Sequence, residues 1–161
     1  MIQLSRKFTV YFFILFSICC SKAEDNPTEF VTRIYDQYQT NHIPDLLGAD
    51  GDTIFTPSFL DKYRAFSKKS SERHGLGWDP LCECDDKEFP GYSVTDVKIK
   101  MTVSKPNYAE FDVRFKNSGF GAGVILVLMK TSGNWLIDDI QTVDMPSLRK
   151  YIVENQKRSK K

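Results

Sequence analysis

Histidine, cysteine and net charge are all scarce in this chain. Its 161 residues include two histidines and four cysteines, and 22 basic residues stand against 21 acidic ones. So few nitrogen and sulfur ligands argue against a zinc site. A near-neutral chain has no general attraction to nucleic acid or to anionic membrane surfaces. No phosphate-binding loop and no nucleophile–base pair is visible, so the sequence predicts neither a cofactor nor a catalytic activity.

Long hydrophobic runs are also missing, except for one near the N-terminus. The uncharged stretch Phe8–Cys20 follows Arg6-Lys7 and precedes Ser21-Lys22-Ala23. A basic region, an apolar run and small residues in this order are typical of an export signal. The run is shorter than the roughly 20 residues that a membrane-spanning helix needs. We therefore expect a signal peptide over 1–23, a single domain over 24–161 and a periplasmic location.

Cys20 leaves one alternative open, which is a lipid anchor. Bacterial lipoprotein signals end in a small residue followed by cysteine, but Ser17-Ile18-Cys19 fits that pattern poorly. Cleavage after Ala23 is the favoured prediction, because the small-residue site there is better. The remaining chain then has 19 basic and 21 acidic residues. Its one basic cluster lies over residues 157–161, where we expect a frayed, solvated tail.

The pattern of the mature chain predicts an α+β fold. Asn26-Pro27 and Thr56-Pro57 are helix starts, and Asp144–Ser147 begins a last helix that runs to about Asn155. Residues 41–55 are expected to be mostly loop. Four strands follow from apolar alternation and turns, and together they form a curved antiparallel meander that cups the helices as a cone. The strands are expected over Val97–Val103, Ala109–Phe115, Gly123–Met129 and Trp135–Ile140.

The continuous apolar run Gly123–Met129 differs from the other three strands. Such a run predicts a central strand that is covered on both faces.

A motif between the helices and the sheet carries a family resemblance. The segment Trp78–Asp85 reads W-D-P-x-C-x-C-D, and Asn134–Ile140 ends the strand pattern. In these features the chain resembles a group of exported bacterial proteins, domain of unknown function 3828, over about Phe30 to Ile140. The resemblance implies a nuclear-transport-factor-2-like, or cystatin-like, α+β cone. It implies no general activity, because the family has none established.

Cys82 and Cys84 are the only cysteines of the expected mature chain. In an oxidising compartment two such cysteines are expected to pair, although the short ring requires a local bend. The favoured interpretation is a structural disulfide beside the core. The alternatives are thiol redox chemistry and thiolate metal binding, and the latter has too few ligands for zinc.

Several isolated polar residues are candidates for binding or catalysis. Trp78 could anchor a partner or plug the open end of the cone, and His74 could act as a base with Asp79 or Asp85. Strand alternation places Asp139, rather than Asp138, on the face of Trp135. A carboxylate in a cone cavity can serve catalysis, but surface packing of His74 and an end-of-strand cap for Asp139 are favoured.

The favoured function is a non-enzymatic binding protein of the bacterial envelope. An immunity protein against a cell-wall-degrading toxin and an accessory subunit of an envelope complex both fit the size. The exposed residues Lys98, Lys100, Arg114 and Lys116 suit a charged protein partner, although such a face is also found merely solvated. A cone that binds or converts a small ligand and a redox protein using Cys82 and Cys84 are the alternatives.

Overall fold

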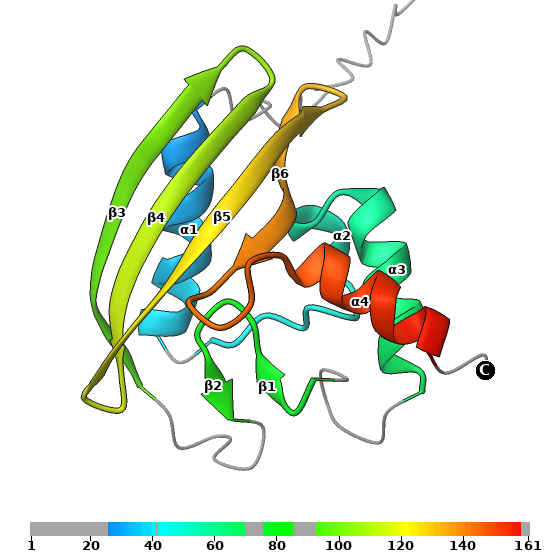
Figure 1. Ribbon diagram of the computed structural model, residues 1–161. Coiled ribbons are helices and arrows are strands. Elements are labelled where there is room, and N and C mark those ends of the chain that lie inside the picture. The colour runs from blue at the N-terminus through cyan, green and yellow to red at the C-terminus, as the bar shows by residue number, and fades with distance from the viewer. Residues whose placement is uncertain (1–25, 41, 70–75, 86–92, 159–161) are drawn as a thin grey trace, which may run out of the picture.

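The computed structural model describes residues 26–40, 42–69, 76–85 and 93–158, and the predicted signal peptide and His74 lie outside them. The helices are α1 (Pro27–Gln39), α2 (Gly51–Ile54), α3 (Pro57–Ser67) and α4 (Leu148–Arg158). The strands are β1 (Trp78–Asp79), β2 (Cys84–Asp85), β3 (Val94–Lys105), β4 (Tyr108–Asn117), β5 (Phe120–Thr131) and β6 (Asn134–Gln141). This is the α+β arrangement predicted from the sequence, and Figure 1 shows its order.

The helix starts follow local capping chemistry. Asn26 Oδ1 accepts a hydrogen bond from the Thr28 amide at 2.9 Å, and Thr56 Oγ1 accepts one from the Phe59 amide at 3.3 Å. Each cap precedes a proline at the first helical position, where no backbone donor is lost. Both predicted starts are confirmed, and α2 is a short addition within the segment expected to be loop.

The large sheet is an antiparallel meander with the order β3-β4-β5-β6. The two hairpins after β4 and β5 turn through Ser118-Gly119 and Ser132-Gly133, which all have positive φ. Two consecutive residues of positive φ make a turn whose twist matches that of the flanking strands. Each strand extends beyond its predicted ends, because the turns are only two residues long.

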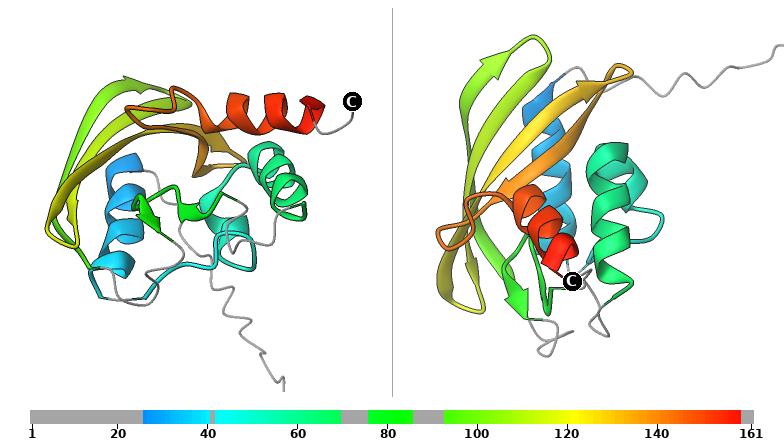
Figure 2. Two further views of the ribbon diagram at one scale, coloured as in Figure 1. Left: turned by 60° about the horizontal axis from the view of Figure 1, so that its bottom comes forward. Right: turned by 45° about the vertical axis from the view of Figure 1, so that its right-hand side comes forward.

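The helices lie on the concave side of the sheet or beyond β6 (Figure 2). Helix α1 packs against β3, while α3 and α4 pack against β6 and against each other. The free edge of β6 is partly closed, because Phe55 forms a parallel bridge with Ile137 and the Thr56 amide donates to the Ile137 carbonyl at 2.9 Å. No helix in the described stretches is long and apolar enough to cross a membrane.

The double cover predicted for the central strand is wrong. In β5 only alternate residues, Val124, Leu126 and Leu128, are fully buried, whereas Ile125 and Val127 are half-buried. The apolar run misleads because neighbouring side chains of the sheet shield the outer residues, with no helix of the described chain over them (Figure 2). Strand β5 is central because it pairs with a strand on each side, but one of its faces is partly exposed to solvent.

Two glycines of β5 provide a test of packing on this face. A Cβ at Gly123 would lie 2.7 Å from Arg114 Cδ and 2.9 Å from the Val113 carbonyl oxygen, whereas a Cβ at Gly121 would meet nothing within 4 Å. We expect Gly123→Ala to lower the free energy of unfolding by about 1–3 kcal/mol through overpacking. Gly121→Ala is the matched control and should be neutral or stabilising by up to about 1 kcal/mol. Urea denaturation measures both, and equal effects would contradict the packing described here.

Candidate functional site

The motif Trp78–Asp85 folds as a small hairpin on the concave side of the sheet. Strands β1 and β2 pair so that Trp78 lies opposite Asp85 and Asp79 opposite Cys84. Glu83 has a φ of 51°, which provides the local bend that the short disulfide ring requires. The structure joins Cys82 and Cys84 with a Cα–Cα distance of 5.1 Å, within the range that a disulfide needs.

Asp79 is the polar centre of this hairpin and has no exposed surface. Its Oδ2 accepts a hydrogen bond from the Tyr38 hydroxyl at 2.7 Å, and its Oδ1 accepts one from the Leu81 amide at 2.8 Å. Tyr35 donates to the Leu81 carbonyl at 2.8 Å. Tyr35 and Tyr38 are three residues apart on α1 and so lie on one side of the helix. They hold the hairpin on α1, which gives Asp79 a structural role.

Burial also changes the pKa values of two side chains in this cluster, Tyr35 and Glu83. Burial raises the pKa of Tyr35 well above its ordinary value, and the charges of Asp79 and Glu83 add to the rise. Burial also raises the pKa of the Glu83 carboxyl. Tyr35 therefore stays a neutral hydrogen-bond donor, as its bond to the Leu81 carbonyl requires.

The predicted site residues do not converge on one place. Trp78 is half-buried and Asp85 is exposed, so these two paired residues could meet a partner, whereas Asp79 could not. His74 lies outside the described residues. In the described stretches no group of three or more histidine, cysteine or acidic side chains is placed to hold a metal ion.

The prediction that Asp139 shares a face with Trp135 is wrong. The pairing of β6 with β5 shifts between Val127 and Leu128, so Asp139 lies opposite outward-facing Val127 and Ile140 takes the inward position. One extra residue in a bulge reverses the alternation after it. Sequence periodicity alone could not reveal this extra residue.

Asp139 instead caps the last helix. Its Oδ1 accepts from the Arg149 amide at 2.9 Å, and its Oδ2 accepts from the Ser147 hydroxyl at 2.6 Å. A carboxylate at a helix N-terminus satisfies free amides and interacts well with the helix dipole. The bulged residue, Asp138, accepts from Thr56 Oγ1 at 2.7 Å and pairs with Arg149. Both carboxylates therefore connect β6 to helices.

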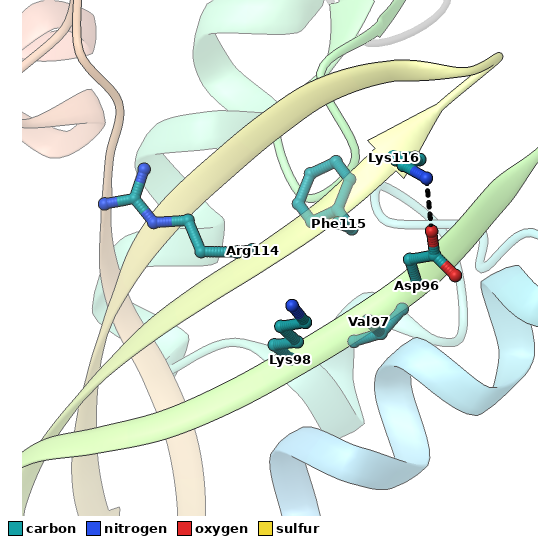
Figure 3. Close-up of a pocket in the computed structure, with 6 residues that line it drawn as sticks. All are labelled: Asp96, Val97, Lys98, Arg114, Phe115 and Lys116. Carbon is teal, nitrogen blue, oxygen red and sulfur yellow. Dashed lines mark ion pairs between the residues drawn. The ribbon is translucent and has the colours of Figure 1, made fainter.

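An open hollow lies between β3 and β4 on the outer side of the sheet. Its volume is about 500 Å³, and Figure 3 shows its lining residues. They are Asp96, Val97, Lys98, Arg114, Phe115 and Lys116. Asp96 has a φ of 53° and lies where the β3–β4 register shifts, so that Asp96 and Val97 oppose the single residue Phe115. This bulge bends β3 and opens the hollow.

We call Lys98, Lys100, Arg114 and Lys116 the basic face. All four are exposed, and the strand register places Lys98 directly opposite Arg114. Lys116 pairs with Asp96 at 2.6 Å, which lowers the pKa of the Asp96 carboxyl and raises that of Lys116. Arg114 pairs with Asp112 at 2.6 Å.

Lys98 differs from Arg114 and Lys116, the two ion-paired residues of the basic face. It makes no ion pair with any described residue, and the side chain across the strand pair, Arg114, has the same charge. Like charges directly opposite each other are destabilising in a sheet. Lys98 thus has no direct ion pair in the described part of the chain, and its charge only adds to that of Lys116 in lowering the pKa of Asp96.

Two exposed apolar side chains lie at the same end of the sheet. Phe120 is 81% exposed at the start of β5, and Val143 is 89% exposed after β6. Val143 lines a second open hollow, of about 410 Å³, which shares Arg114 and Phe115 with the first. Sequence reasoning missed Phe120, although an aromatic residue directly after the turn Asn117–Gly119 was a visible signal.

No protein-family model matches this chain, and no curated protein sequence does either. Among solved structures, a phospholipid-binding protein from Ralstonia solanacearum in complex with a phospholipid is similar to it. The sequence identity is 15% and the TM-score 0.38, over 82% of this chain and 70% of that chain. A similarity of this size supports no conclusion about the ligand of the present protein.

The link between α1 and the hairpin can be tested by removing one hydroxyl. We expect Tyr38→Phe to lower the free energy of unfolding by about 1–3 kcal/mol, because a buried carboxylate loses a donor. The matched control is Tyr151→Phe on α4, whose side chain is 44% exposed and whose ring meets that of Phe66 edge-on. Denaturant unfolding that shows equal stability for both variants would contradict the structural role of Asp79.

The disulfide can be tested by its accessibility. Both cysteines have no exposed surface, so a thiol in solution cannot reach their sulfurs in the native fold. We expect dithiothreitol to leave the bond intact in a chain that begins at Glu24, and to reduce it once denaturant unfolds the protein. Alkylation followed by mass spectrometry measures this. Rapid reduction under native conditions would instead favour the redox alternative.

Proposed function

We propose that this protein is a non-enzymatic, exported binding protein of the bacterial envelope, and that it recognises an acidic protein partner through its basic face. The observation that carries the proposal is the arrangement of Lys98 and Arg114. They stand opposite each other in an open hollow, and Lys98 makes no ion pair with any described residue. An acidic group from a partner would relieve this repulsion and would steer association.

The non-enzymatic part of the proposal rests on what the candidate catalytic groups do. Asp79 holds the hairpin on α1, and Asp139 caps α4. The sulfurs of Cys82 and Cys84 are bonded to each other inside the core. Each of these groups is occupied by a structural contact and lies away from the hollow. Catalysis at the hollow would need a base or nucleophile, whereas its exposed lining offers cations and the paired carboxylate of Asp96.

Export and family membership belong to the same proposal. The order of Arg6-Lys7, Phe8–Cys20 and Ser21-Lys22-Ala23 supports a signal peptide, and a disulfide suits an oxidising compartment. The motif Trp78–Asp85 supports membership of domain of unknown function 3828. An immunity protein and an accessory subunit of an envelope complex both remain within the proposal, because each acts by binding a protein.

Capture from the native envelope tests this function. Protein tagged at its C-terminus and recovered from the envelope should begin at Glu24 by mass spectrometry and should retain an acidic partner. Lys98→Glu combined with Arg114→Glu should reduce recovery of that partner by about tenfold, because both attractive charges are reversed. The matched control is Lys68→Glu combined with Lys150→Glu, which makes the same change of charge on α3 and α4.

Two results would contradict parts of the proposal, the first its partner recognition and the second only its predicted cleavage after Ala23. Equal loss of the partner in both double variants would show that overall charge, and not the basic face, is recognised. A lipid on Cys20 would show that the protein is anchored to the membrane. Recovery of the partner by the charge variants would then still test the basic face.

A further inference from the structure

The two edges of the large sheet differ. The edge of β6 is partly closed by residues 55 and 56, as described above. At the other edge, β3 pairs with β4 alone, and no described residue pairs with its second side. Figure 1 shows β3 as the outermost strand. An edge strand presents a row of free amides and carbonyls that can pair with another extended chain.

Only a short part of β3 is regular enough for such pairing. The register with β4 shifts between Thr95 and Lys98 and again between Met101 and Val103. Bulges twist a strand and interrupt its ladder, and proteins use them to prevent uncontrolled pairing of edges. Between the two bulges, the run Lys98–Met101 pairs without interruption. The available edge is therefore a four-residue run beside the hollow.

The side chains of this run specify the chemistry of an added strand. Lys98 and Lys100 point to the outer face, and Ile99 and Met101 alternate with them. Met101 is 43% exposed, so part of its apolar surface has no cover. On the β4 side, Lys100 faces Asp112 but Lys98 faces Arg114. A carboxylate next to Lys98 on the free side would supply the missing opposite charge.

A second copy of this chain fits the edge poorly. Antiparallel pairing of two β3 strands about Ile99 would place Lys98 of one protomer against Lys100 of its partner. Each such contact brings together like charges, which destabilise a strand pair. An acidic segment has the opposite charge at both positions.

We infer that a short extended segment of the partner protein, with alternating acidic and apolar residues, adds to β3 as a fifth strand along Lys98–Met101. This inference rests on the proposed function, since it specifies how the acidic partner engages the basic face. Backbone hydrogen bonds provide the affinity of such strand addition, and alternate side chains provide its specificity. The acidic residues lie beside Lys98 and Lys100, and the apolar ones extend the surface of Ile99 and Met101.

Synthetic peptides test the inference without knowledge of the natural partner. The probe is a short peptide of alternating glutamate and valine, added to isotope-labelled protein that begins at Glu24. We expect amide resonances to shift along Lys98–Met101 and alternate amides of that run to become protected from hydrogen exchange. The same peptide methylated on alternate backbone nitrogens should bind at least about tenfold more weakly, because it has lost its ladder donors.

Charge reversal on the strand supplies the second arm. Lys98→Glu combined with Lys100→Glu should weaken peptide binding by about tenfold. For a comparison at equal change of charge, Lys105→Glu is the control for Lys98→Glu alone. Lys105 lies on the same strand beyond the second register shift, and its reversal should have a smaller effect. Sedimentation of the free protein should show a monomer.

The outcomes separate this inference from the proposed function. Equal affinity of the methylated and unmethylated peptides, or resonance shifts away from β3, would overturn strand addition and leave the acidic partner of the basic face intact. A dimer that Lys98→Glu strengthens or disrupts would identify a second copy as the occupant and overturn the inference. In a further outcome, the peptide adds to β3 as expected while the Lys98 and Arg114 substitutions leave recovery of the envelope partner unchanged. That combination would refute the proposed function but not strand addition.

Discussion

The hydrogen bonds of the buried Asp79 carboxylate hold together the packing on the concave side of the molecule. A charge without water is costly unless hydrogen bonds replace the solvent, and Tyr38 and the Leu81 amide supply them here. Through these bonds the hairpin is held on α1. The Asn117 side chain donates to the Glu83 carbonyl at 3.1 Å and connects the hairpin to β4. The Asp79 carboxylate thus joins the hairpin to a helix, and the Asn117 amide joins the same hairpin to the main sheet.

Strand bulges place the other important carboxylates. In β6 the extra residue turns Asp139 outward, where it caps α4, and leaves Asp138 between Thr56 and Arg149. In β3 the bulge puts Asp96 beside Lys116 and opens the hollow. A β-bulge therefore positions the cap of a helix at one edge of the sheet, and another β-bulge exposes cations at the other edge. Each bulge contains an aspartate, Asp138 in β6 and Asp96 in β3, but their surroundings assign these two carboxylates different roles.

The charges of the outer face contribute little to the stability of the fold. Lys116 and Asp96 are both more than half exposed, and such pairs contribute little to folding because water and salt screen them. The stability of the fold therefore does not require Lys98 to stand opposite Arg114, and their mutual repulsion slightly lowers the free energy of unfolding. In the proposed complex, an acidic chain would remove that repulsion. The bulges around Lys98–Met101 then restrict the paired length, which limits unspecific contact between edges.

Features that depend on near neighbours could be predicted from the order of the residues alone. The helix starts at Asn26 and Thr56, the glycine turns and the four strands belong to this group, because capping and pleating act within a few residues. The bend between Cys82 and Cys84 was predictable for the same reason.

The geometry of the candidate site depends instead on contacts between segments that are distant in the chain. Strand register is a relation between distant segments, so periodicity could suggest that Lys98 and Arg114 share a face but could not show that they are opposite each other. An extra residue in β6 moved Asp139 from the expected inner face to the helix cap. Asp79 was a candidate for binding, or for catalysis together with His74, until its burial against Tyr38 became visible. In each case the deciding contact lies far along the chain from the residue that it positions.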